Sequence, residues 1–437
     1  MDNKHKSVWA DSVKMPEFRK LQGDCKTDVL IIGGGIAGIL TAYFLQQHNI
    51  DYILVEKGKI CDATTQNTTA KITLSHGLIY SKILKSSGVE VAQGYYNVNK
   101  KAIEQYFSLC EDIDCDFSVQ DNFVYSLDSR HKLEQELIAI DKIGGRAEYC
   151  DELKIPLKTA GAVRVRNQAQ FNPLKFLSSI SKGLNIFENT KVLELSNNCA
   201  ITDCGKITAE KIVVATHFPF LNKHGNYFLK LYQHRSYVLA LKNAQNVGGM
   251  YIDESNKGLS FRNYGEYLLL GGGGHRTGKK GCAWNTLKEF ADKNYPQNIV
   301  RYQYATQDCM SLDSMYYIGR YGKSTDDLLV ATGFNKWGMT GGMVSAMVLC
   351  DMLTGAKSEF EEIFNPHRNI LTPQLFLNSA EAIKNLLTPS TKRCPHLGCA
   401  LKWNCYERSW DCACHGSRFD EDGTVLNNPA TDDLKNV

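Results

Sequence analysis

The chain has 437 residues, of which 43% are hydrophobic and 22% are charged, a composition typical of globular proteins rather than of disordered or multi-pass membrane chains. Its 50 basic and 47 acidic side chains leave a formal net charge of +3, so no global field favours nucleic acid or an acidic membrane as the partner. The length allows two or three domains with a large buried core.

The cysteine count is the unusual feature of this composition. Fifteen cysteines form an odd set, and the N-terminal arm, residues 1–26, has no apolar segment of the kind found in signal peptides. We therefore expect most of them to be free thiols in a reducing, cytoplasmic compartment. Ten are dispersed along the chain without metal-ligand spacing, whereas five fall in the last 44 residues.

The first predicted element is a βαβ unit. An apolar run over 28–32 leads into Gly33-Gly-Gly-Ile-Ala-Gly38 and then into a helix-like pattern through Leu45, and a second apolar run over 52–55 ends in Glu56. Glycines at this turn permit a tight bend and a close backbone approach to a pyrophosphate, which faces the helix N-terminus. The acidic residue binds ribose hydroxyls and repels a 2′-phosphate, so FAD or NAD is favoured over NADP.

Two further strand-and-turn patterns lie downstream. Lys211-Ile-Val-Val-Ala-Thr-His217 is an apolar run that ends in a small-residue turn. Asp327-Leu-Leu-Val-Ala-Thr-Gly333 leads into a glycine-rich turn and an apolar helix through Leu353. A second helix N-terminus suits the pyrimidine carbonyl of a flavin, where negative charge accumulates on reduction, so these patterns favour FAD over NAD.

Together these motifs resemble the D-amino-acid oxidase/glycine oxidase family of FAD-dependent oxidoreductases. The resemblance rests on the N-terminal fingerprint, on Val213-Val-Ala-Thr216, on Tyr317-Ile-Gly-Arg320 and on the segment from Ala331 to Thr340. It implies that 27–365 contains a Rossmann-like α/β FAD-binding domain interleaved with a substrate domain built around an antiparallel sheet. The implied FAD-binding segments are about 27–80, 155–220 and 310–360, and the substrate domain holds the remainder.

The resemblance also implies which residues contact the FAD. Val192 occupies the place where such proteins meet the adenine through backbone groups, and the stretch from Thr64 to Lys71 is expected near the flavin. The full implied set is Gly33, Gly35, Ile36, Ala37, Gly38, Glu56, Lys57, Thr64, Thr65, Lys71, Val192, Ala215, Thr216, Gly333, Trp337, Gly338, Met339 and Thr340.

One departure from the family bears on the substrate. Amino-acid-oxidising relatives commonly carry an arginine that pairs with the substrate carboxylate, a few residues before the aspartate that leads to Tyr-Ile-Gly. Here Asp313 is that aspartate and Asp308 occupies the arginine position, so a neutral or cationic amine is favoured over a simple α-amino acid. No general acid or base stands out. The candidates for catalysis or substrate binding are His275, Arg235, Tyr237 and Asp308, with Arg276 as another substitute for the arginine.

From residue 366 the pattern changes to that of a connecting helix. Apolar residues recur at near-helical spacing between Pro373 and Pro389, so the segment 366–390 predicts a helix that links two domains. The cysteine-rich tail, 391–437, begins directly after it.

The tail carries two short Cys/His motifs. Cys394-Pro-His396 is followed after fifteen residues by Cys412-Ala-Cys-His415. Zinc also accepts such a set, but one thiolate and one imidazole from each loop, in this order, is what a Rieske [2Fe-2S] centre needs. The local sequence closely resembles Rieske ferredoxins and the Rieske subunits of cytochrome bc complexes. That resemblance implies that the metal ligands are Cys394, His396, Cys412 and His415. It further implies a disulfide between Cys399 and Cys414.

The tail is shorter than the Rieske domains that it resembles. Such domains usually place several strands of a base sheet before the first ligand loop, whereas only a few residues separate Pro389 from Cys394. We therefore expect a small all-β cluster-binding subdomain that depends on the flavin domain for burial. Phe419 stands where high-potential members have tyrosine, so we expect a potential within the Rieske window of about −150 to +300 mV but below its top end.

These features predict an oxidoreductase with FAD and a Rieske [2Fe-2S] cluster. We expect it to oxidise a small organic substrate, an amine-type C–N donor, and to pass electrons from flavin to cluster and on to an acceptor protein or quinone. The alternatives are an electron-transfer protein without its own organic substrate, and an oxygen-using amine or amino-acid oxidase with a structural or sensing cluster. The glycine fingerprint explains the uncharged stretch over 29–45, so we expect no transmembrane segment.

Overall fold

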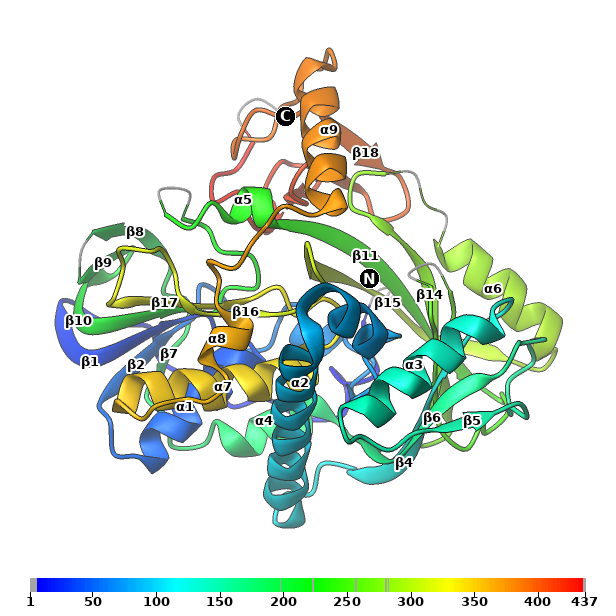
Figure 1. Cartoon of the computed structure of the whole chain (residues 1–437). Helices are drawn as coiled ribbons and strands as arrows, with labels where there is room; N and C mark the ends of the chain where they lie inside the picture. The colour runs from blue at the N-terminus through cyan, green and yellow to red at the C-terminus, as the bar shows by residue number, and fades with distance from the viewer. Residues whose placement is uncertain are drawn as a thin grey trace.

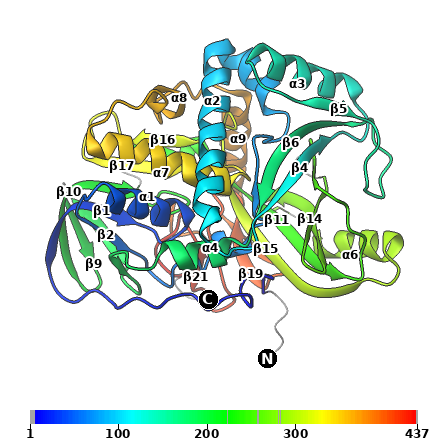
Figure 2. The same cartoon turned by 90° about the horizontal axis from the view of Figure 1, so that it is seen from below.

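The computed structural model describes residues 6–196, 198–221, 224–255, 258–279, 281 and 283–434. Within these residues the chain forms three sheets, of eight, nine and four strands, with helices packed around them (Figures 1 and 2). Cys282, one of the ten dispersed cysteines, lies outside the described residues. In the described part, no helix is both long enough and apolar enough to cross a membrane.

The first sheet contains the strand of the glycine fingerprint. β1 (Cys25–Ile32) pairs in parallel with a neighbour on each side, as expected for a βαβ unit. Val29 and Ile31 point into a core shared with α1 (Ile36–Gln47) and α7 (Gly338–Thr354), whereas alternate side chains enter a second core on the opposite face. The remaining strands are β16 (Tyr317–Arg320), β17 (Leu328–Thr332), β10 (Gly205–Val214), β2 (Tyr52–Val55), β7 (Ile186–Phe187), β8 (Val192–Ser196) and β9 (Cys199–Thr202).

The second sheet is antiparallel except where β12 pairs with β4. Its strands are β15 (Ile299–Ser311), β11 (Leu231–Lys242), β14 (Tyr267–Arg276), β13 (Ser260–Tyr264), β12 (Met250–Asp253), β4 (Ser118–Tyr125), β6 (Ala162–Gln170), β3 (Lys71–Ile72) and β5 (Glu148–Cys150). Two strands of this sheet lie in segments expected to bind FAD. β3 lies in the segment 27–80 and pairs with β6, and β6 lies in the segment 155–220 and pairs with β4 along most of its length.

Helices fill the space around the two sheets. α2 (Ile79–Glu111) spans 33 residues and is broken at Gly88, where a φ of 88° interrupts the helical geometry. The others in this part of the chain are α3 (Arg130–Lys142), α4 (Pro173–Ile180), α5 (Tyr227–Lys230), α6 (Ala283–Asn294), α8 (Glu361–Phe364) and the 3₁₀ turn η1 (Thr65–Asn67).

The C-terminal unit consists of α9 (Pro373–Leu387) and the third sheet, and it sits above β11 and α5 in Figure 1. Thr372 caps the helix by accepting a hydrogen bond from the N–H of Leu375. The third sheet is antiparallel and packs around a small cysteine-rich core. Its strands are β18 (Leu401–Asn404), β19 (Ser409–Cys412), β20 (Arg418–Phe419) and β21 (Val425–Asn427). The expected fold class is confirmed: an α/β unit interleaved with a sheet-based unit, followed by a small all-β subdomain.

Candidate functional site

The turn after β1 approaches β10 more closely than a side chain would allow. A Cβ on Gly33, whose φ is 115°, would lie 2.6 Å from the carbonyl oxygen of Ala215. A Cβ on Gly38 would lie 2.0 Å from the carbonyl oxygen of Gly33, so only glycine fits either position. Glu56, just after β2, accepts a hydrogen bond from the N–H of Gly34 at 2.8 Å. The turn, the start of α1 and this carboxylate therefore converge at one edge of the first sheet.

A cavity of about 540 Å³ opens at this edge and is lined by residues of both large sheets. Its size is that of a cofactor or small-molecule site. Most of the implied FAD contacts line it: Gly33, Gly35, Ile36, Ala37, Glu56, Lys57, Thr64, Thr65, Lys71, Ala215, Thr216, Trp337, Gly338 and Met339.

Four of the implied FAD contacts do not line this cavity, namely Gly38, Val192, Gly333 and Thr340. Gly38 instead allows α1 to pack against the turn, and the Thr340 hydroxyl donates to the carbonyl oxygen of Thr73 at 3.2 Å. Val192 is buried at the start of β8. Most of the implied FAD contacts thus line one cavity, and these four lie outside its lining.

Lys71, His76 and Trp337 line another part of the cavity. The His76 ring stacks on the Trp337 ring with 4.8 Å between centroids, and its Nδ1 lies 2.7 Å from the Tyr95 hydroxyl. Burial lowers the pKa of His76 to about 3, so the imidazole is neutral. Burial, assisted by Arg262, also lowers the pKa of Lys71 to about 7.

Asp308, the acid at the expected arginine position, faces the cavity from β15. Ser236 on β11 donates a hydrogen bond to its carboxylate at 2.8 Å, and both residues line the wall. Burial raises the pKa of Asp308, although the nearby cation of Lys336 acts in the opposite direction. Lys336 also lines the cavity, and burial lowers its pKa while Asp308 raises it. The acid and the cation thus partly compensate each other within the cavity.

Two other candidate residues, Arg235 and His275, do not line the cavity. The pairing of β11 with β14 is irregular between Arg235 and Tyr237, and the Arg235 guanidinium pairs with Glu407 of the C-terminal unit. The His275 ring stacks on Tyr237 with 5.6 Å between centroids. Tyr237 lines the cavity, but its hydroxyl donates to Glu407 at 2.9 Å. Arg235 and Tyr237 therefore contact the C-terminal unit, and His275 packs on Tyr237.

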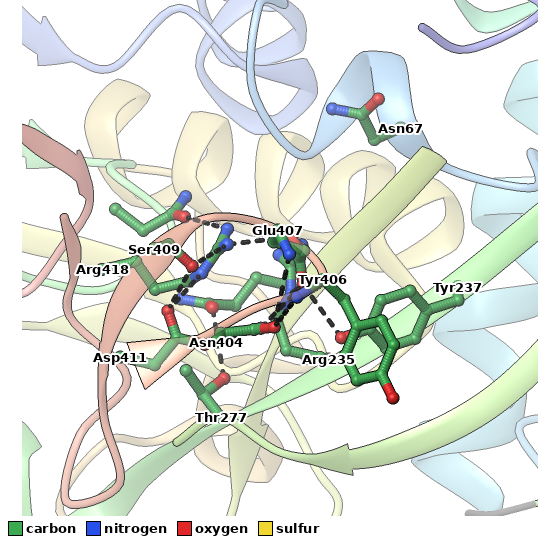
Figure 3. Close-up of polar contacts among 12 residues, drawn as sticks. Asn67, Arg235, Tyr237, Thr277, Asn404, Tyr406, Glu407, Ser409, Asp411 and Arg418 are labelled. Carbon is green, nitrogen blue, oxygen red and sulfur yellow. Dashed lines mark hydrogen bonds and ion pairs between the residues drawn. The ribbon is translucent and has the colours of Figure 1, made fainter. Parts of the chain in front are cut away.

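Buried charges join β11 to the C-terminal unit (Figure 3). The guanidinium of Arg235 pairs with the Glu407 carboxylate, which also pairs with Arg418 at 2.9 Å. Arg418 in turn pairs with Asp411 at 3.0 Å. Burial raises the pKa of Glu407, but the two arginines lower it by more, to about 2. Glu407 therefore stays ionised at neutral pH, and its charge is compensated inside the protein.

The two Cys/His loops bring together the donor set expected for a cluster. The side chains of Cys394 and Cys412 are buried and interact directly, and the rings of His396 and His415 are 5.0 Å apart between centroids. Burial lowers the pKa of His396 to about 4 and that of His415 to about 3, so both imidazoles are neutral, the form that binds metal. Nδ1 of His415 is buried without a hydrogen-bond partner among the described residues. Two thiols and two neutral imidazoles fit a [2Fe-2S] centre of Rieske type.

Cys399 and Cys414 form a disulfide beside these loops, with their Cα atoms 6.7 Å apart. Their sulfur atoms and that of Cys412 lie within 4.8 Å of one another. Bonded cysteines offer no thiolate, so this pair braces the loops and only Cys412 of the three can act as a ligand. Cys405 is exposed.

Two glutamines of the second sheet donate to the backbone of the second cluster loop. Gln233 Nε2 donates to the carbonyl oxygen of His415 at 3.1 Å, and Gln307 Nε2 donates to that of Gly416 at 2.8 Å. Gln233 also lines the cavity. A single side chain therefore reaches from the cavity wall to the loop that carries His415.

Arg276 holds the same loop from β14. Its guanidinium donates to the carbonyl oxygens of Ala413 at 2.8 Å and Cys414 at 2.7 Å, so it is not available to a substrate in the cavity. A Cβ on Gly278 would lie 2.5 Å from the Ala413 nitrogen. The loop thus lies directly against the turn after β14, and the cluster unit is buried on the rest of the chain, as its missing base sheet predicts.

The C-terminal unit also forms part of the cavity wall. Residues 425–428, which include β21, line the cavity that Gly33 and Trp337 also line. The side chain of Asn428 donates to the carbonyl oxygen of Thr216 at 3.2 Å. The cavity and the unit that carries the cluster loops therefore share a wall.

The residues of this contact were not identifiable from the sequence. Gln233, Gln307, Glu407 and Arg418 belong to none of the recognised motifs, and 172 residues separate Arg235 from Glu407. The one available signal, the missing base sheet, predicts that the tail is buried but not which side chains bury it.

Comparisons with known proteins agree with this geometry. The family model for FAD dependent oxidoreductases matches residues 28–352, and that for the Rieske [2Fe-2S] domain matches residues 371–437. The chain is 32% identical to the Rieske 2Fe-2S iron-sulfur protein YhfW of Bacillus subtilis (strain 168), over 99% of this chain and 97% of the relative. Its fold is similar to that of glycine oxidase from Geobacillus kaustophilus, with a TM-score of 0.67 and 16% identity over 79% of this chain and 99% of that one. L-proline dehydrogenase from P. horikoshii has the same TM-score of 0.67 and 16% identity over 80% and 98% of the two chains.

Proposed function

Because the chain belongs to the FAD dependent oxidoreductase family and carries a Rieske [2Fe-2S] domain, we propose that it oxidises a small amine at FAD and delivers the electrons through the cluster to an external acceptor. The observation that carries this proposal is the shared wall. Residues 425–428 of the C-terminal unit line the same cavity as Gly33 and Trp337. A donor cofactor and an acceptor cofactor on either side of one wall need no mobile carrier between them.

We assign the parts of FAD to the cavity by the chemistry of its wall. The pyrophosphate is assigned to the turn at Gly33 and the N-terminus of α1, where N–H groups and the helix dipole favour negative charge. The ribose hydroxyls are assigned to Glu56, and the flavin pyrimidine to the N-terminus of α7 at Gly338 and Met339.

We assign the cluster to the two buried loops. Its ligands in this proposal are the thiolates of Cys394 and Cys412 and the imidazoles of His396 and His415. Ser417 lies beside them: its hydroxyl oxygen accepts the N–H of Ala430 at 3.0 Å, and its side chain bonds to Cys394. The hydrogen bond with Cys412, and to a smaller extent that with Ser417, lowers the pKa of the Cys394 thiol. A hydroxyl in this position stabilises added negative charge on a neighbouring sulfur.

FAD supplies a two-electron acceptor and the cluster supplies a one-electron carrier when each is bound. The residues of the chain bind and orient the amine. Asp308 attracts a cationic or neutral nitrogen, and Ser236 holds its carboxylate in place at 2.8 Å. Lys336 brings a positive charge to the same cavity, which suits an amine that also carries a carboxylate. Two relatives in fold are named for glycine and L-proline, which both have these two groups.

Anaerobic mixing of the holoenzyme with a panel of amines and amino acids tests this function. A true substrate bleaches the flavin absorbance first, and the electron paramagnetic resonance signal of the reduced cluster follows. In the matched Cys412→Ser variant, which loses a proposed ligand, bleaching persists and the later signal is absent.

Other outcomes decide against the proposal. Bleaching with a cluster that stays oxidised contradicts the electron path. Peroxide release in air that is unchanged in Cys412→Ser supports an oxidase. Absence of bleaching with every amine, together with reduction of both cofactors by external electron carriers, supports an electron-transfer protein.

A further inference from the structure

The outward face of α9 is apolar although it faces solvent. Phe376, Ile383 and Leu387 are 68%, 58% and 77% exposed. Together with Ala380 they recur at i, i+4, i+7 and i+11, the spacing of one continuous helix stripe. In Figure 1 the helix stands at the outer edge of the molecule.

The face of α9 that contacts the protein is mostly polar, with Ala382 as a small apolar contact to the cysteine-rich core. Asn378 and Asn385 are the buried residues of this helix. The Asn378 side-chain oxygen accepts a hydrogen bond from Arg276 at 2.6 Å, and Glu381 pairs with Lys279. An ordinary surface helix buries its apolar stripe, so α9 has the reverse orientation, and these bonds hold it there.

The apolar stripe continues onto the first cluster loop. Arg393 donates hydrogen bonds to the carbonyl oxygens of Leu386 at the end of α9 and of Gly398 in the loop, at 3.2 and 2.8 Å. Leu397, which follows the proposed ligand His396, is 41% exposed. We call this surface, made of Phe376, Leu377, Ile383, Leu386, Leu387 and Leu397, the α9 surface.

The charged groups around the α9 surface are basic. Between residues 371 and 398 the charged side chains are Lys384, Lys392, Arg393 and Glu381. The acid is largely buried and paired with Lys279, whereas Lys384 and Arg393 are exposed. The surface therefore combines an apolar stripe with exposed positive charge from its own segment, although the whole chain is close to neutral.

We propose that the α9 surface docks onto an anionic lipid membrane, with its apolar side chains at the boundary between headgroups and acyl chains. Exposed Leu, Ile and Phe on one helix face, flanked by Lys and Arg, match the chemistry of that boundary. A symmetric pairing of two copies would instead place the basic residues Lys384 and Arg393 of one copy against the same basic surface of the other. The proposal concerns this surface alone and does not depend on the substrate.

Flotation of the holoenzyme with lipid vesicles tests the proposal. We expect binding to phosphatidylcholine vesicles that contain phosphatidylglycerol, weaker binding to phosphatidylcholine alone, and loss of the difference at high salt. Ile383→Gln should lower the partition coefficient by about tenfold, because one apolar side chain is withdrawn from the boundary. Lys384→Glu should weaken binding to the anionic vesicles only.

The chain offers a matched control for the apolar variant. Ile138 on α3 is 58% exposed, as is Ile383, so Ile138→Gln makes the same change on another helix and should leave binding unchanged. Flavin and cluster absorbance show whether each variant keeps its cofactors. Absence of vesicle binding by the wild type overturns the proposal. An equal loss of vesicle binding in Ile383→Gln and Ile138→Gln also overturns it. A dimer in sedimentation that Ile383→Gln converts to a monomer, without vesicle binding, assigns the surface to a second copy instead.

Discussion

Arg235 on β11 and Glu407 in the C-terminal unit form a buried ion pair across 172 residues of sequence. Their side chains are only 4% and 9% exposed, so water cannot solvate either charge if its partner is removed. The pair lies between the strand that carries Gln233 and the unit that carries the Cys/His loops. It is therefore a part of the structure that positions the cluster against the cavity.

Removal of Arg235 should destabilise the protein strongly. Arg235→Met leaves Glu407 buried with one arginine fewer, and breaking a buried pair in this way costs about 3 kcal/mol or more. Urea denaturation followed by circular dichroism measures the effect. Lys211→Met is the control, because its pair with Asp327 is 40% and 48% exposed and should contribute less than about 1 kcal/mol. Equal decreases in the free energy of unfolding of Arg235→Met and Lys211→Met would contradict the assigned role.

The same pair predicts a pH dependence of stability. The pKa of Glu407 is about 2 in the folded chain and about 4.3 in an unfolded one, so its stabilisation is complete above about pH 4.3 and is lost as the pH falls toward 2. The difference in unfolding free energy between wild type and Glu407→Gln should therefore shrink over this range. Urea midpoints of both proteins at a series of pH values measure it, and a constant difference would refute the prediction.

Glycine at position 278 should be needed for cluster assembly. Gly278→Ala and Gly265→Ala both place a side chain at positive φ, of 75° and 54°, which costs about 1 kcal/mol in each case. Only Gly278 abuts another chain segment, with Ala413 at 2.5 Å from the added Cβ. We expect Gly278→Ala to lower the iron and sulfide content per chain and Gly265→Ala to leave it unchanged. Similar contents in the two variants would show that the loop tolerates displacement.

The proposed ligand set predicts a selective loss of metal. Cys394→Ser and His415→Ala should abolish the electron paramagnetic resonance signal of the reduced cluster and lower the iron content, while FAD stays bound. Cys405→Ser should leave both the resonance signal and the iron content unchanged, because that thiol is exposed and outside the loops. Elemental analysis for iron and zinc checks the result. Retention of the signal in Cys394→Ser, or zinc in place of iron in the wild type, would contradict the assignment.

The sequence by itself determined the features that depend on local spacing. The glycines at 33–38 and Glu56 identify the dinucleotide turn because steric limits on the backbone act within a few residues. The Cys/His loops identify the cluster unit because each loop supplies its donors within four residues. The missing base sheet also predicts correctly that this unit is buried against another part of the chain.

Only the tertiary structure decided which distant side chains meet. The sequence offers Arg235, His275 and Asp308 alike as candidates for the substrate cavity, yet only Asp308 lines it, while Arg235 pairs with Glu407 and His275 packs on Tyr237. The apolar periodicity of α9 predicts a helix but says nothing about which face the protein covers. Asn378 faces the protein because Arg276 bonds to it, and the apolar stripe is left outside. Such pairings join residues separated by a hundred positions or more, and no local pattern encodes them.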